Sequence, residues 1–479
     1  MVTNALGLGS DEIIFSLRDP SGRVFSVDRR IIRSVTGAAV PALTAFLKSS
    51  AAKALVQERS LVSTRILTKT ETAEWLSKLD SVAAKHCKEG GLLLEHERIP
   101  FVSFPYEWCV EMLWAAADLT LRIPERLWPE GFAMKDANTY NVAFRGPDPV
   151  FVDLLSFEMR APQTPNSLPE GEFAEAFLIP LMMNKYYGVP LDRLLFARPK
   201  LRPREVYGWC RGPRKLLFPF LQLVSIPAWY GARKRRHQLA APLQKLVLEP
   251  SRREALIRWL IGDLRSKLNG LLPSPKKPEQ NQYYSPEELT KKRHFLERTL
   301  QDFDPKRVLN IGGSPEWIPV LAAAGRNVVA IDRDPAVVGE FWRIARAKKL
   351  NVLPLVVDFC RPTPSMGWRN QERPGFLQRA RGAFDILIML GVVHHVLMHE
   401  RIPIEEVVDL AAELTNDLLL IEDIDCNEPI FHAISQGRDY LFTALSPENF
   451  RKQFLRKFFL SSSEELPSSN RRLYVFRKR

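Results

Sequence analysis

Small and acidic residues follow successive apolar stretches in the second half of the chain, with types and spacing that fit a nucleoside-type ligand. Asn310, Gly312 and Gly313 end the first stretch, and glycines let the backbone approach a ligand closely. Asp332 ends the second stretch, where an acidic residue can accept two hydrogen bonds from ribose hydroxyls. Asp358 ends the third, where a carboxylate can accept a hydrogen bond from an adenine amine.

The fourth and fifth apolar stretches end in residues that can move protons or orient a second substrate. His394 and His395 are candidate general bases, because a free imidazole titrates near neutral pH; the alternative is that either ring caps or packs the following helix. His395 and His399 have metal-ligand spacing but lack an acidic partner, so we expect no metal site. Glu422 and Asp423 either orient a cationic or hydroxyl-bearing acceptor or belong to a solvated loop.

These residues need a parallel sheet to bring them together. The pattern predicts helices such as Pro286–Leu300 and Glu405–Leu414 between short apolar strands, which are typical of sheets buried on both faces. The predicted strands are Arg307–Ile311, Asn327–Ile331, Val352–Val357, Phe384–Leu390 and Leu418–Ile421. Ligands of open α/β sheets bind outside the carboxyl ends of the strands. The sequence therefore predicts a doubly wound, Rossmann-like α/β domain with its site at that edge.

This ordered series resembles the class I S-adenosylmethionine-dependent methyltransferases. Their pattern is a D-x-G-x-x-x-G turn, an acid ending the second strand, and a polar or acidic residue after the third. The resemblance implies S-adenosylmethionine as cofactor, bound by Asn310, Gly312, Gly313, Glu316, Asp332 and Asp358. Asn310 and Glu316 stand where the family has Asp and Gly, so either Glu316 supplies the missing carboxylate or the site has lost catalysis.

Further segments resemble one bacterial subfamily, in which a methyltransferase follows a long N-terminal region and which includes a rhizobial host-specific nodulation protein. The matching segments are Phe101–Trp108, Lys135–Glu158, Pro364–Arg373, the His394-His395 pair and Ser446–Arg479. The resemblance implies methyl transfer to an unidentified small-molecule or saccharide- or lipid-linked acceptor, in nodulation or specialised metabolism.

A second constellation in the first half resembles protein kinases and aminoglycoside-type phosphotransferases. Asp136 and Asn141 have D-x-x-x-x-N spacing, and Asp153 follows an apolar stretch twelve residues after Asn141. Asp136 could accept a hydroxyl proton, while Asn141 and Asp153 could hold Mg²⁺ of Mg·ATP. No G-x-G-x-x-G loop or V-A-I-K-like lysine accompanies them, so the alternatives are a kinase-like fold without phosphotransfer, a bifunctional kinase-methyltransferase, a degenerate binding protein, or residues that only cap turns.

Proline-rich residues 272–286 predict a linker between an N-terminal α+β domain, residues 1–271, and the methyltransferase-like domain, residues 287–479. In the N-terminal domain we expect a hairpin over Ile13–Val27, a buried helix over Val110–Leu121, and a helix over Glu172–Tyr187 with a kink at Pro180.

Composition and charge exclude several classes of protein. An apolar fraction of 46% and a charged fraction of 26% exclude wholesale disorder. The net charge is +13, but twelve Lys or Arg against two acids place +10 of it in Leu191–Arg236. This segment surrounds an apolar run, Leu216–Tyr230, and the alternatives are contact with an anionic membrane, a cradle for an anionic substrate, or a helix pair with a solvated basic edge. No RNA-binding motif is present, so we expect no nucleic-acid partner.

Cysteine usage and hydropathy indicate the compartment. The 5 cysteines include no CxxC pair, which argues against a disulfide framework or zinc knuckle. The first fifteen residues lack the basic region of a signal peptide, and no apolar run reaches the roughly 20 residues of a spanning helix. We therefore expect a cytoplasmic protein.

Overall fold

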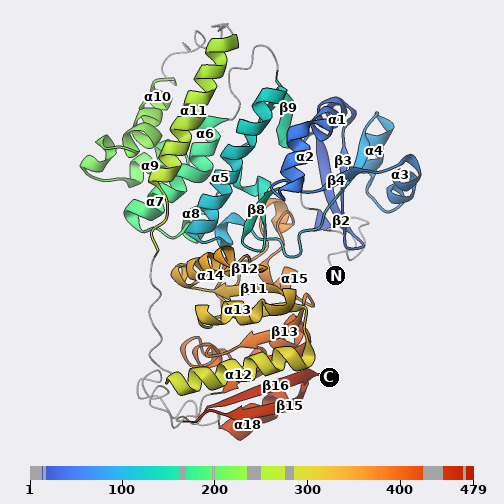
Figure 1. Cartoon of the computed structure of the whole chain (residues 1–479), viewed down its shortest axis with the longest axis vertical. Coiled ribbons are helices and arrows are strands. Elements are labelled where there is room, and N and C mark those ends of the chain that lie inside the picture. The colour runs from blue at the N-terminus through green and yellow to red at the C-terminus, as the bar shows by residue number, and fades with distance from the viewer. Residues whose placement is uncertain are drawn as a thin grey trace. The chain divides into compact units, whose positions relative to one another are not determined.

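The computed structural model describes residues 13–14, 18–160, 169–196, 198, 200–234, 250–275, 285–423, 446–467 and 471–479. The chain forms two compact units (Figure 1). The first contains residues 1–144, 148–274 and 366–373, and the second contains residues 145–147, 275–365 and 374–479. Among the described residues no single helix is long and apolar enough to cross a membrane, and one bent pair, Gly37–Lys48 with Ser50–Gln57, passes by length and composition.

The second unit is built on a 7-stranded sheet in the order β12-β11-β10-β13-β14-β16-β15. Its strands are β10 (Arg307–Ile311), β11 (Asn327–Asp332), β12 (Val352–Val356), β13 (Phe384–Met389), β14 (Thr415–Asp423), β15 (Phe458–Glu465) and β16 (Arg472–Lys478). The first five are parallel, whereas β16 runs antiparallel to both β14 and β15. The order reverses between β10 and β13, which is where open α/β sheets bind ligands.

This sheet confirms the five predicted strands and corrects the all-parallel expectation. β15 and β16 add an antiparallel edge, and alternation of exposed and buried residues along β15 shows that only one of its faces is covered. Between β10 and β11 the chain forms a 3-10 turn, Pro315–Trp317, and a short helix, α13 (Ile318–Leu321). Each piece begins next to a proline, which cannot donate a backbone hydrogen bond to the preceding turn.

Helices cover the sheet of the second unit. α12 (Pro286–Phe303), α13 and α14 (Pro335–Ala347) form one layer in Figure 1, and α16 (Ile404–Leu414) packs on β13, β14 and α18 (Pro447–Phe454). α15 spans Phe376–Ala380. The core beneath α12 to α14 contains Phe295, Val308, Ile318, Phe341 and Ile388, each at most 1% exposed. The strand ends are therefore held on a rigid base.

The first unit begins with a 5-stranded antiparallel sheet in the order β1-β2-β3-β5-β4. Its elements are β1 (Ile13–Ile14), β2 (Gly22–Val27), β3 (Arg30–Val35), α1 (Val40–Lys48), α2 (Ser50–Gln57), β4 (Thr64–Ile66), α3 (Lys69–Leu76), α4 (Ser81–Lys88) and β5 (Leu92–His96). The predicted hairpin is present, with Ile13 opposite Ser26, and Asp19 accepts a hydrogen bond from the Ser21 amide at 2.8 Å in its turn.

A mostly helical part follows that sheet, with two short hairpin-like strand pairs beside the buried helix α5 (Val110–Leu127). The strands β6 (Phe132–Met134) and β9 (Phe157–Met159) pair antiparallel, and β7 (Val142–Arg145) pairs with β8 (Asp148–Phe151). The remaining helices are α6 (Glu170–Phe173), α7 (Ile179–Tyr187), α8 (Leu191–Leu195), α9 (Pro203–Trp209), α10 (Ile226–Lys234) and α11 (Pro250–Gly270). A π-type turn, Ala174–Leu178, precedes Pro180 within the predicted helix.

Candidate cofactor site

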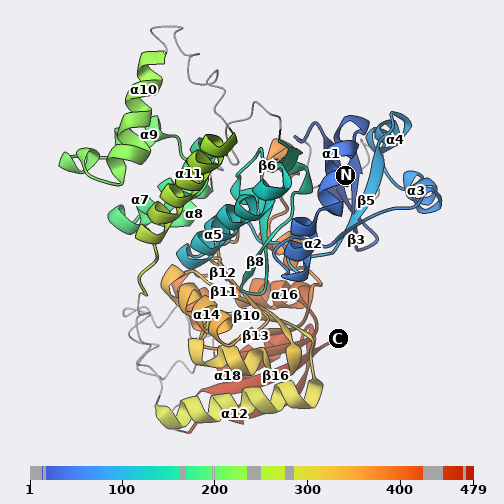
Figure 2. The same cartoon turned by 45° about the horizontal axis from the view of Figure 1, so that its top comes forward.

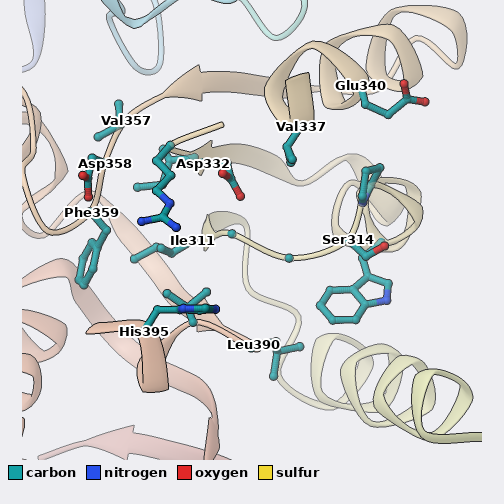
Figure 3. A pocket seen from close by; sticks show the side chains of 18 of the residues that line it. Ile311, Ser314, Asp332, Val337, Glu340, Val357, Asp358, Phe359, Leu390 and His395 are labelled. Atoms are coloured by element: carbon teal, nitrogen blue, oxygen red, sulfur yellow. The ribbon is translucent and has the colours of Figure 1, made fainter. Parts of the chain in front are cut away.

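A cavity of about 1210 Å³ opens at the carboxyl ends of β10 to β13 in the second unit. Its wall includes the predicted residues Gly312, Gly313, Glu316, Asp332, Asp358 and His395. Figure 3 shows the Asp332 carboxylate and the His395 ring pointing toward the middle of the cavity from different sides, with Asp358 and Phe359 at one end. The structure thus brings six predicted residues from four strand ends into one wall.

The turn after β10 depends on its two glycines. Gly312 has φ +64° and Gly313 has φ +95°, which L side chains rarely adopt. A Cβ on Gly312 would stand 2.7 Å from the Val392 side chain. Asn310 is buried and does not line the cavity; its Nδ2 donates to the Gly312 carbonyl oxygen at 2.6 Å. Asn310 therefore fixes the turn from behind and has no direct access to a ligand.

Asp332 and Asp358 face the cavity from the neighbouring strands. Asp332 accepts a hydrogen bond from the Asp334 amide at 2.8 Å, and burial raises the pKa of Asp332 to about 6. Asp358 accepts from the Cys360 amide at 2.9 Å and lies 3.3 Å from Arg361, which also pairs with Glu400. Both residues thus line the cavity, and each carboxylate is held by a backbone amide two residues further along the chain.

The two histidines differ in their access to the cavity. His395 lines it, whereas His394 does not, although the two ring centroids are 4.1 Å apart. Burial lowers the pKa of His395 to about 4, and burial together with the charge of His395 lowers the pKa of His394 well below its usual value. Both imidazoles are neutral at pH 7 and weakly basic, so His395 is better suited to accepting a hydrogen bond than to taking up a proton.

Glu422 and Asp423 lie on β14 and are 2% and 5% exposed, which excludes the solvated-loop alternative for these two residues. Lys292 of α12 reaches Glu422 at 2.6 Å, and Arg471 lies 3.8 Å from the same carboxylate. Lys292 also lines the cavity, with its Nζ 5.7 Å from the centre of the Trp317 ring. Lys292 was not predicted from the sequence. The only indication there is that a charged residue falls on the buried face of an amphipathic helix.

In the first unit the structure brings the other predicted residues together. Asn141 Nδ2 donates to the Asp136 carbonyl at 3.2 Å and to Ser156 Oγ at 3.0 Å, and that hydroxyl donates to Asp153 at 2.7 Å. Burial and the nearby carboxylate of Glu172 raise the pKa of Asp136 to about 6. These residues follow β6 and β8, so two short strand pairs position them.

Arg33 of β3 is a further member of this cluster that sequence reasoning missed. It is 4% exposed and pairs with Asp153 at 2.6 Å and Asp19 at 2.8 Å. Burial by itself would raise the pKa of Asp153. The Arg33 guanidinium and the Ser156 hydroxyl outweigh burial and hold the pKa below its usual value. An arginine inside the apolar strand Arg30–Val35 was the available sequence signal.

Comparison with curated proteins gives one strong relative. The chain is 27% identical to the nodulation protein NoeA of Rhizobium meliloti (strain 1021), over 97% of this chain and 95% of NoeA. The chain is a relative of a rhizobial nodulation protein. This confirms the subfamily resemblance found in the sequence motifs, and the likeness to NoeA spans both units. No family model matches the chain.

Two solved structures illustrate the similarity of parts of the chain. Magnesium protoporphyrin IX methyltransferase of Synechocystis PCC 6803, with bound SAH, is 16% identical, with a TM-score of 0.30 over 42% of this chain and 90% of that one. The bifunctional kinase-methyltransferase WbdD is 20% identical, with a TM-score of 0.28 over 40% of this chain and 38% of that one. The Rossmann-like fold of the second unit follows from its own strand order and parallel pairing.

Proposed function

We propose that the second unit is an S-adenosylmethionine-dependent methyltransferase. The observation that carries the proposal is the Gly312–Gly313 turn at the switch point of the sheet, with Asp332 facing the same cavity from the next strand. A backbone cradle beside an acidic strand end fits a nucleoside ligand. The relationship to NoeA supports a role in nodulation or specialised metabolism.

The cavity residues fit the parts of this cofactor. Asp332 would accept from the ribose hydroxyls, Asp358 from the adenine amine, and the Gly312–Gly313 backbone would lie against the methionine moiety. Asn310 is uncharged and is turned away from the cavity. A carboxylate that pairs with the cofactor ammonium must therefore come from another residue. Glu316 is exposed on the cavity wall and carries that charge.

Methyl transfer requires little covalent chemistry from the protein itself. When bound, S-adenosylmethionine would supply a sulfonium methyl group for in-line displacement, in which the carbon–sulfur bond breaks, S-adenosylhomocysteine leaves and the proton of the methyl acceptor is lost to water. The chain positions the acceptor and excludes water. The neutral His395 ring accepts a hydrogen bond from a hydroxyl or amine group of the methyl acceptor at the cavity wall. This hydrogen bond orients the methyl acceptor. The acceptor is a small molecule or a saccharide- or lipid-linked intermediate.

Calorimetry of the full chain with S-adenosylmethionine tests this proposal. We expect binding, and Glu316→Gln should weaken it at least about tenfold, because a charge-assisted hydrogen bond is worth about 1.5–3 kcal/mol. Glu340→Gln is the matched control: Glu340 lies on the same wall but pairs with Arg343 at 2.5 Å, so affinity should hold. No binding by the unaltered chain would remove the proposal, and equal effects of both variants would remove the role of Glu316.

We propose a second, alternative activity for the first unit, phosphotransfer from Mg·ATP. Its antiparallel sheet, buried helix, and Asp136, Asn141 and Asp153 follow one another in the order of the kinase-like fold that the sequence resembles. A pKa of about 6 suits Asp136 to accept a hydroxyl proton at neutral pH. One observation opposes this activity. Both Asp153 oxygens already accept hydrogen bonds, from Arg33 and Ser156, so Mg²⁺ would have to displace one of these two side chains.

Titration of the full chain with Mg·ATP tests this alternative. If the first unit binds the nucleotide, Asp153→Asn should lower the affinity at least about tenfold, because it weakens the metal-binding carboxylate. Asp148→Asn, at the start of the neighbouring strand β8, is the control and should leave affinity unchanged. Absence of Mg·ATP binding, or equal binding by Asp153→Asn, would exclude phosphotransfer through this site.

A further inference from the structure

We propose that the first unit docks on an anionic membrane through one surface of Pro203–Tyr230. We call this surface the apolar-basic patch; it consists of Trp209, Arg211, Arg214, Lys215, Leu216, Leu217, Phe218, Ile226, Trp229 and Tyr230. The inference is independent of methyl transfer, because it rests on residues of the first unit alone and its test uses no cofactor.

Large apolar side chains of the patch are unusually exposed. Leu216, Leu217 and Phe218 are 61%, 59% and 69% exposed, and Trp209 is 51% exposed. Ile226, Trp229 and Tyr230 are also exposed, and their i, i+3, i+4 spacing places them on one face of α10. Monomeric proteins rarely expose such concentrations of apolar surface unless it binds something.

The patch stands on a packed base, so its exposure is a feature of the folded unit. Val206, Cys210, Phe220 and Val224 are at most 1% exposed beneath it. α9 contacts both α10 and the π-type turn Leu221–Ser225, and Figures 1 and 2 show α9 and α10 at the outer edge of the unit. The exposed side chains are therefore presented by a rigid support.

Tyr207 links the two halves of the patch. The Lys215 ammonium lies 4.0 Å from the centre of the Tyr207 ring, and the Trp229 ring meets Tyr207 from α10 at 6.2 Å between centroids. The segment Arg211–Phe218 and the exposed face of α10 thus belong to one continuous surface. Aromatic rings beside cations are typical of the water–membrane boundary.

The charge of the patch selects an anionic surface over a neutral one. The sequence Val206–Tyr230 contains no Asp or Glu. Among the residues that the structure describes, no carboxylate pairs with Arg211, Arg214 or Lys215, whereas Arg198 and Lys200 pair with Glu205 and Glu172. Unneutralised cations around apolar side chains gain both from anionic headgroups and from shallow insertion.

Sedimentation of the full chain with lipid vesicles tests the proposal. We expect binding to phosphatidylcholine vesicles containing roughly 30% phosphatidylglycerol, much weaker binding to pure phosphatidylcholine, and loss of binding at high salt. Leu217→Ser with Phe218→Ser should weaken binding at least about tenfold, because two inserting side chains lose their apolar area. Arg211→Gln with Lys215→Gln should weaken it about fivefold per charge.

Controls separate membrane docking from other uses of the patch. Phe459→Ser removes another exposed phenylalanine, 55% exposed, from the second unit and should leave vesicle binding unchanged. Circular dichroism checks that every variant is folded. No binding to anionic vesicles, or equal binding by the Leu217→Ser, Phe218→Ser variant, would overturn the proposal. If that variant instead turns a dimer into a monomer while vesicle binding persists, the patch is an interface between copies of the chain.

Discussion

If Asp332 binds S-adenosylmethionine as proposed, it should set the pH dependence of the affinity. Its raised pKa of about 6 means that the carboxylate proposed to accept from the ribose hydroxyls is largely protonated below that value. Affinity for S-adenosylmethionine should therefore fall about tenfold for each pH unit below 6 and be constant above 7. Calorimetry at several pH values checks this, and Asp332→Asn should bind weakly with no such pH dependence; an unaltered pH dependence in that variant would contradict the assignment.

The same residue couples the site to stability. Because folding raises the pKa of Asp332, the folded state binds the proton more tightly than the unfolded state, and stability is lost as pH rises from about 4 through about 6. At pH 7 Asp332→Asn should therefore stabilise the cofactor-free protein, by about 1–2 kcal/mol in chemical denaturation. The site keeps a carboxylate that costs stability, as expected of a binding residue.

Which residues could be predicted depends on whether a general rule of the fold places them. Gly312, Asp332 and Asp358 could be predicted because strand ends in a parallel sheet share an edge. The orientation of the Asn310 side chain away from the cavity could not, because it depends on a hydrogen bond to Gly312. Arg33 was missed for a different reason: its partner Asp153 is far along the chain, and only the fold brings the two together.

At the scale of elements, the parallel strands were recognisable because each is a short, nearly continuous apolar run bounded by turn residues. β15 was not, because its sequence FFLSSSEE has polar residues over most of its length. An edge strand with an exposed hydrophilic face has a sequence much like that of a loop. The two can be told apart only when the partner strand is known. The antiparallel edge of the sheet could therefore not be predicted.

α12 is held on the sheet by a buried ion pair as well as by apolar packing. Lys292 and Glu422 have wholly buried side chains 2.6 Å apart. Lys292→Met should destabilise the second unit by about 3–5 kcal/mol, because it removes the nearest compensating charge from Glu422. Adding Glu422→Gln should recover at least half of the loss. Chemical denaturation measures both, and a Lys292→Met variant as stable as the original would show that the pair contributes nothing.

At the scale of the whole molecule, +10 of the net charge of +13 lies in one segment, Leu191–Arg236. In the part of this segment that the structure describes, Arg198 and Lys200 pair with carboxylates, whereas the cations of the apolar-basic patch have no carboxylate partner. The sequence predicted the local excess because charge can be counted along the chain. It could not separate paired from unpaired cations, because Lys200 pairs with Glu172, which lies outside the segment.

The two units should respond separately to the two nucleotide-type ligands. S-adenosylmethionine at about one hundred times its Kd adds about 2.7 kcal/mol to the stability of the unit that binds it, so amide exchange there should slow up to about 100-fold. In hydrogen–deuterium exchange of the full chain, we expect protection around Gly312–Ser314, Asp332 and Asp358, and none in Asp136–Ser156. Asp332→Asn at the same ligand concentration should lose most of this protection. Protection of Asp136–Ser156 by S-adenosylmethionine alone would instead place the cofactor in the first unit.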